Sequence, residues 1–147
     1  MNKAQMMTLS PQKIAQVLAL AQIPQSFAEL DAMISSGLPK GSLKASIEHV
    51  YSSAEDRNAL LYRIIPEATY KRRRDSLTAE ESGRAERLAR IIATAEYVWN
   101  SAQDARTFLT TPHSMLQGRK PLDVSLTELG ARRVEELLWR LYYGIAA

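Results

Sequence analysis

Apolar residues recur along almost the whole chain at spacings of three and four positions, which is the period of an amphipathic α-helix. The clearest stripe lies near the middle of the chain and consists of Leu88, Ile91, Ile92, Ala95, Val98 and Trp99. Thr78 and Glu81 precede it with the spacing of a capping box, in which each residue caps a backbone N–H of the other. The pattern predicts an all-α protein whose longest helix begins after Thr78.

Polar residues that cap helices divide the rest of the pattern into shorter segments. Ser10, Ser26, Ser53, Ser101 and Thr127 each stand just before an apolar stripe, where a side-chain oxygen can accept a hydrogen bond from the first turn. We expect the buried positions of these helices to be Ile14, Val17, Leu18, Ala21, Phe27, Leu30, Ile34, Leu43, Ile47, Val50, Leu60, Leu61, Ile64, Ala105, Phe108, Leu109, Val134, Leu137, Leu138 and Leu141.

Composition narrows the class of protein. A chain of 147 residues with 46% hydrophobic residues is long enough to bury a core. Cysteine is absent from the sequence, which excludes disulfides and thiolate metal sites. Residues 1–9 lack the pattern of a secretory signal, and no apolar run approaches the roughly 20 residues that span a bilayer. We therefore expect a cytoplasmic protein with no membrane partner.

The densest charge in the chain follows a helix–break–helix pattern formed by residues 54–64, Ile65-Pro66 and residues 67–74. This layout suits a helix-turn-helix, whose second helix enters the major groove of DNA. Thr69, Tyr70 and Arg73 are then expected to reach base edges or phosphates. Lys71, Arg72 and Arg74 are expected to neutralise phosphates. The alternative is a solvated helix end, where cations complement the helix dipole.

The last third of the chain carries an ordered set of positions: an aromatic-Leu-x-x-Pro segment, a leucine and a glycine, Pro-Leu, a threonine and a glycine, and a helix that ends in glycine. These positions are Phe108, Leu109, Pro112, Leu116, Gly118, Pro121, Leu122, Thr127, Gly130, Val134, Leu138 and Gly144. Upstream, Thr69 is followed by Arg72 and Arg73, and residues 80–84 contain Glu-Ser-x-Arg. Together these features resemble antitoxins of the RES–Xre (ParS-type) toxin–antitoxin family.

The resemblance implies two parts: residues 1–76 as an N-terminal region with an Xre-like helix-turn-helix, and residues 77–147 as a connecting helix and toxin-binding domain. It also implies a RES-domain toxin partner that consumes NAD, whose active-site entrance is blocked by the C-terminal end of the antitoxin. A homodimer within a larger complex would bind operator DNA and repress its own operon. By position, the residues at the toxin's entrance would be Arg140, Tyr143, Gly144, Ile145, Ala146 and Ala147.

The aromatic residues of the last helix support an interface on physical grounds. Trp139, Tyr142 and Tyr143 span more than half of a helical wheel, so they cannot all face one core. We expect at least one of them to be exposed, as interface aromatics often are. The alternative is that the rings pack against the N-terminal half or a second copy of the chain.

The sequence offers little for catalysis. The two histidines, His49 and His113, suit a partnered or surface position and a helix start, and they are not spaced as metal ligands. The neighbouring carboxylates at residues 80–81 and 135–136 are expected at helix starts or on solvated faces. We therefore expect no enzyme activity, no cofactor and no metal site. The competing interpretation is a stand-alone helix-turn-helix transcription regulator, whose C-terminal domain only dimerises.

Overall fold

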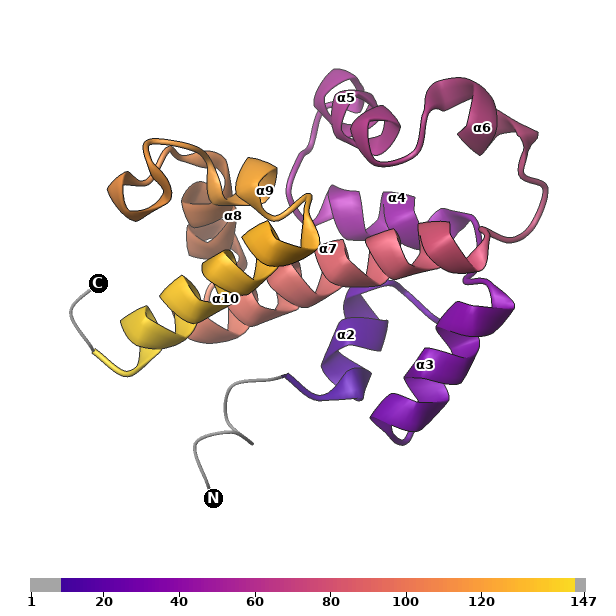
Figure 1. Cartoon of the computed structure of the whole chain (residues 1–147), viewed down its shortest axis with the longest axis horizontal. Helices are drawn as coiled ribbons and strands as arrows, with labels where there is room; N and C mark the ends of the chain where they lie inside the picture. Colours follow the sequence, from indigo (N-terminus) through magenta and orange to yellow (C-terminus); the bar gives the residue numbers. More distant parts are fainter. Residues whose placement is uncertain (1–8, 145–147) are drawn as a thin grey trace.

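The computed structural model describes residues 9–144, which form helices, turns and two isolated β-bridges, Pro39 with Ser76 and His113 with Arg119. The predicted all-α fold is confirmed for this part of the chain (Figure 1). The helices are α2 (Pro11–Val17), α3 (Phe27–Ser36), α4 (Gly41–Glu48), α5 (Ala54–Ile64), α6 (Glu67–Arg72), α7 (Ala79–Trp99), α8 (Ala102–Thr110), α9 (Pro121–Val124) and α10 (Glu128–Tyr142), with a 3₁₀ helix η1 (Ser114–Leu116).

Helix α7 is the central element of the molecule. It opens with the predicted capping box between Thr78 and Glu81, and it ends where Asn100 adopts the left-handed conformation. Helices α2, α3 and α4 pack against it from the N-terminal half of the chain, and α8 and α10 pack against it from the C-terminal half. Figure 1 shows α7 running through the middle of the fold with α10 alongside it. Both halves of the sequence therefore share one core.

The local capping chemistry fixes where the helices begin. The side chains of Ser10, Ser26, Ser53, Ser101 and Thr127 each accept a hydrogen bond from the backbone N–H three residues later, at 3.0 to 3.2 Å. Such a cap stabilises a helix by about 1 kcal/mol. The five predicted helix starts are confirmed.

The first helix is shorter than predicted, since it ends at Val17 whereas the sequence favoured continuation through residue 21. Ala19 has a positive φ of 55°, and the Leu20 N–H bonds to the carbonyl of Ala15 at 3.0 Å. This turn brings Leu20 into the core and leaves Ala21 exposed. Burial of the larger leucine side chain outweighs one more turn of helix.

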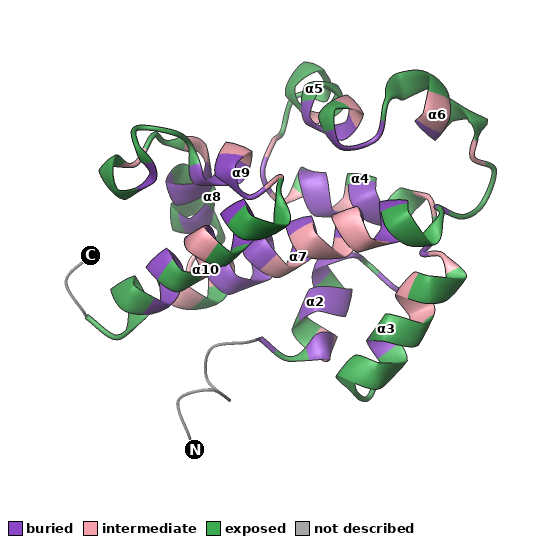
Figure 2. Ribbon diagram, in the orientation of Figure 1, coloured by how far each residue is buried: buried purple, intermediate pink, exposed green. Residues whose placement is uncertain are grey.

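Three residues predicted to be buried lie at helix ends and are exposed. Phe27 is 50% exposed, Trp99 is 39% exposed and Leu141 is 36% exposed. Phe27 is the first residue of α3, Trp99 is the last of α7, and Leu141 is next to the last of α10. Figure 2 shows exposed positions at the end of α10 and along α6. Within residues 9–144, no helix combines the length and apolar character that crossing a membrane requires.

Gly130 lets α10 pack against the last residue of α9. A β-carbon at this position would collide with the carbonyl oxygen of Val124, which is backbone and cannot swing aside. We expect Gly130→Ala to lower the free energy of unfolding by about 2 kcal/mol, the usual size of an overpacking defect. Urea unfolding followed by circular dichroism measures this change.

The matched control is Gly83→Ala, which lies within α7 with open space around it. This substitution removes a flexible residue from a helix interior and should raise stability by roughly 0.5–1 kcal/mol. Equal effects of the two substitutions would contradict the role given to Gly130.

Candidate functional site

Helix α6, the second helix of the predicted helix-turn-helix, follows a sharp break at Ile65 and Pro66. It is anchored by Tyr70, which is 4% exposed and donates a hydrogen bond from its hydroxyl to the Lys40 carbonyl at 3.3 Å. The ring also meets Tyr62 edge-on, with centroids 6.4 Å apart. The sequence suggested Tyr70 as a DNA contact, whereas the structure places its ring in the core.

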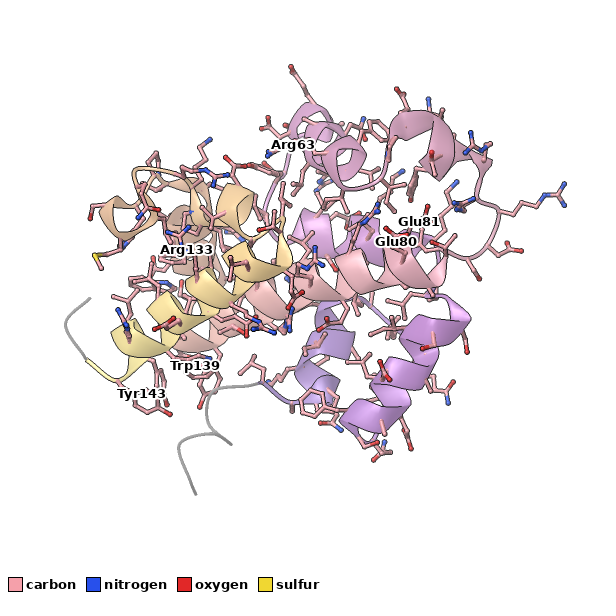
Figure 3. The ribbon with its side chains drawn as sticks, viewed as in Figure 1. Arg63, Glu80, Glu81, Arg133, Trp139 and Tyr143 are labelled. Carbon is pink, nitrogen blue, oxygen red and sulfur yellow. The ribbon has the colours of Figure 1, made fainter. Side chains whose placement is uncertain are left out.

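Arg73 also turns back toward the protein. Its Nε and Nη2 donate to the two carboxylate oxygens of Glu81 at 2.9 and 2.8 Å, which is a bidentate pair. Figure 3 shows Glu81 at the start of α7, where its side chain is 7% exposed. Hydrogen bonding from Arg73, with a further bond from the Thr78 N–H, lowers the pKa of Glu81 to about 2. This pair ties the end of α6 to the start of α7.

The other predicted DNA contacts are accessible. Thr69 is half-buried, whereas Lys71, Arg72 and Arg74 are exposed. Lys71 forms an ion pair with Glu67 one turn earlier at 2.9 Å, which surface exposure makes weak. These three cationic side chains are therefore accessible from solvent.

Two further cations lie beside α6, and sequence reasoning missed them. The Nζ of Lys40 is 4.7 Å from the centroid of the Tyr70 ring, and the Nζ of Lys44 is 5.9 Å from it. Lys40 also donates to the Arg73 carbonyl at 2.9 Å. Their spacing of four residues puts both on one face of α4, which was the available signal. We use the term basic surface for Lys44, Lys71, Arg72 and Arg74.

Ion pairs join the C-terminal half of the chain to α7. Arg87 donates to Glu128 at 3.0 Å, and Arg90 lies 3.3 Å from Glu135 and 3.7 Å from Glu86. Burial raises the pKa of Glu86 and of Glu135. Glu135 was expected on a solvated face, but it is only 17% exposed because α10 turns this side toward α7. The pairs fix α10 in position.

The end of α10 carries aromatic side chains in two environments. Trp139 is 4% exposed and packs on Tyr97, with ring centroids 5.7 Å apart. Tyr142 and Tyr143 are 41% and 36% exposed, so the prediction of exposed rings is confirmed. The hydroxyls of Tyr142 and Tyr97 lie 3.3 Å apart. Figure 3 shows Trp139 and Tyr143 at this end of the helix.

The remaining predicted toxin contacts lie at or beyond this end. Arg140 is exposed and pairs with Glu136 at 2.9 Å, and Gly144 has a φ of 68°. Ile145, Ala146 and Ala147 lie outside the described residues. The structure thus brings Arg140, Tyr143 and Gly144 together at one tip.

Both histidines have structural partners. The Nδ1 of His49 lies 3.0 Å from a Glu96 oxygen, and this hydrogen bond raises the pKa of His49. The Nδ1 of His113 accepts a hydrogen bond from the Met115 N–H at 3.0 Å, which caps η1 as a helix-start residue does. In the part of the chain that the structure describes, no three metal-ligating side chains gather.

Comparison with known proteins matches two successive regions of the chain. Residues 29–90 match the antitoxin Xre-like helix-turn-helix domain, and residues 94–144 match the antitoxin Xre/MbcA/ParS C-terminal toxin-binding domain. The Antitoxin Xre of Pseudomonas putida is 33% identical over 135 residues, covering 88% of this chain and 82% of the relative. The first region contains the basic surface, and the second contains the aromatic tip of α10.

Proposed function

This chain belongs to the Xre antitoxin family, with a helix-turn-helix followed by a toxin-binding domain, and we propose that it neutralises a RES-domain toxin that consumes NAD. Arg140 and residues 143–147, together termed the blocking segment, would occupy the entrance of the toxin's active site. Inhibition would be steric, without chemistry by the antitoxin. The antitoxin would act in the cytoplasm and repress its own operon through operator DNA.

The observation that carries the blocking proposal is the fixed position of the tip of α10. Buried Trp139 and the ion pairs of Arg87 and Arg90 hold the helix on α7. Arg140 and Tyr143 project from its exposed end, and these residue types are enriched among interface hot spots. The end of α10, held in place before binding, would lose less entropy when it binds, which favours affinity.

The basic surface supports the proposal of DNA binding. Arg72 is exposed on α6 and Thr69 is half-buried there, and both would reach base edges. Lys44, Lys71 and Arg74 would neutralise phosphates. We give Tyr70 and Arg73 a positioning role, because their side chains hold α6 against α4 and α7. A homodimer would place two such surfaces in successive half-sites about 34 Å apart. The functional division before α7, between residues 76 and 77, is part of this proposal.

We expect Arg74→Gln to weaken operator binding and to make it less sensitive to salt. Each lost phosphate contact reduces the slope of log affinity against log salt by about 0.9. Fluorescence anisotropy on promoter DNA of the operon, titrated between low and physiological salt, measures both quantities. Because Arg74 is exposed, the unfolding curve should not change.

The matched control for this experiment is Arg106→Gln, an exposed arginine on α8 within the toxin-binding region. It removes the same charge from the chain, so a purely long-range effect would appear in both variants. An unchanged salt slope in Arg74→Gln, or an equal fall in both variants, would contradict the assignment of the basic surface to DNA.

Co-purification separates the antitoxin from a stand-alone regulator. The antitoxin proposal predicts a stoichiometric complex with a co-expressed RES-domain toxin, which survives size-exclusion chromatography. A toxin that elutes apart from this chain and stays active would support the regulator interpretation instead.

A further inference from the structure

An apolar groove of about 320 Å³ lies beside the tip of α10, within the region that matches the toxin-binding domain. The end of α7, helix α8, the loop after α8 and the last turn of α10 all contribute to it. The groove is lined by Trp99, Asp104, Thr107, Phe108, Pro112 and Leu141, with Thr111 and His113. None of these residues belongs to the blocking segment.

The two threonine hydroxyls and the His113 Nδ1 along the groove already form hydrogen bonds within the protein. The hydroxyl of Thr107 donates to the Gln103 carbonyl at 3.1 Å, and that of Thr111 donates to the Thr107 carbonyl. The Nδ1 of His113 is held by the Met115 N–H. The groove therefore offers mainly methyl groups and ring faces to a partner, so an apolar side chain is the ligand that fits it.

Large apolar side chains at the groove are exposed to solvent. Trp99 and Leu141 are 39% and 36% exposed, and the Trp99 ring packs beside Phe108 at 5.9 Å between centroids. On the other side of the same helix end, Tyr142 and Tyr143 are also exposed. Large apolar side chains that stay exposed around one groove are a common feature of interaction surfaces.

The edge of the groove carries one acidic side chain. Asp104 is exposed, and among the described residues it takes part in no ion pair, although its backbone N–H is capped by Ser101. An apolar side chain seated in the groove would place its neighbouring residues near this carboxylate. A lysine or arginine there would be attracted to it.

We propose that the groove binds an apolar side chain of the toxin, flanked by a lysine or arginine that reaches Asp104. The toxin is the occupant favoured here because Leu141 belongs to the same last turn of α10 that leads into the blocking segment, so a toxin covering that segment also lies over the groove. This inference rests on the proposed function. On this inference the two surfaces have different roles. The groove contributes to the affinity for the toxin, and the blocking segment inhibits it.

Filling the groove tests this division. Thr107→Phe adds a ring at an exposed position of α8, and Ala102→Phe adds the same ring on α8 outside the groove. We expect Thr107→Phe to raise the Kd for the RES-domain toxin at least tenfold, while saturating antitoxin still stops NAD consumption completely. Ala102→Phe should stay within twofold of the unmodified protein. Calorimetry gives the Kd, and an NAD assay gives the inhibition.

A charge variant provides a second measurement that does not depend on packing. Asp104→Asn should raise the Kd for the toxin severalfold and reduce the dependence of this Kd on salt. The control Asp31→Asn, at an exposed position of α3, should leave both quantities unchanged. The inference is overturned if Thr107→Phe binds as Ala102→Phe does. It is also overturned if filling the groove dissociates the free antitoxin, because the occupant is then a second copy of this chain.

The two proposals fail separately. A protein that lacks residues 143–147 but still inhibits the toxin fully would remove the blocking proposal and leave the groove result standing. Unchanged affinity of the groove variants would remove the groove and leave the blocking proposal standing.

Discussion

We expect removal of residues 143–147 to abolish neutralisation of the toxin, while the protein stays folded and keeps any DNA binding. The side chains that hold α10 on α7 lie before this segment, since Trp139 is buried and Arg90 pairs with Glu135. What the deletion removes is Tyr143 and the rest of the blocking segment after Arg140. Growth of cells that co-express the toxin measures protection, and an NAD assay with purified proteins measures inhibition directly.

Glu136→Gln is the control for this deletion. It breaks the surface ion pair with Arg140 but keeps the segment itself, and such exposed pairs contribute at most about 1 kcal/mol. Protection should therefore be retained. Undiminished protection by the shortened protein would show that the toxin is blocked by another part of the molecule.

Arg73→Ala is expected to lower the free energy of unfolding, because it leaves the carboxylate of Glu81, whose side chain is 7% exposed, without its cation. It should also weaken operator binding, since the end of α6 loses its attachment to α7. Arg74→Ala, one residue later and exposed, should change stability by less than about 0.5 kcal/mol. Urea unfolding of the two variants measures the difference.

The same pair predicts how stability depends on pH. The pKa of Glu81 falls to about 2 in the folded protein because Arg73 stabilises the charged carboxylate. A lowered pKa means that the contribution is complete above the ordinary glutamate range and is lost as the pH falls toward 2. Arg73→Ala should lack this part of the acid dependence. If the free energy of unfolding falls in parallel for Arg73→Ala and for the unmodified protein between pH 5 and 2, the role given to the pair is contradicted.

The helix starts could be predicted from sequence because capping is local. The Ser53 side chain needs only the N–H of Asp56, and Thr78 and Glu81 cap each other across three residues. These contacts are decided by residues that are close in the chain, whatever the rest of the fold does. The order of the family positions in the last third of the chain likewise predicted the toxin-binding domain that the comparisons confirm.

The candidate site was harder to predict because its side chains contact residues that are distant in the sequence. In the sequence, Arg73 cannot be distinguished from the other three cations of residues 71–74. In the fold, Arg73 forms the ion pair with Glu81. Tyr70 becomes a core residue because Lys40, thirty residues earlier, is brought beneath its ring. Periodicity fixes the face on which Trp99 lies, but it does not predict that this last residue of α7 stays 39% exposed.

The continuity of α7 has a consequence for how antitoxins of this family can exchange partners. Arg87 and Arg90 belong to the region that matches the helix-turn-helix domain, whereas Glu128 and Glu135 belong to the toxin-binding domain. A chimaera that joins residues 1–90 to the toxin-binding domain of another antitoxin would strand two partly buried guanidinium groups. A junction placed before Arg87 would keep both arginines and their glutamate partners in one transferred block.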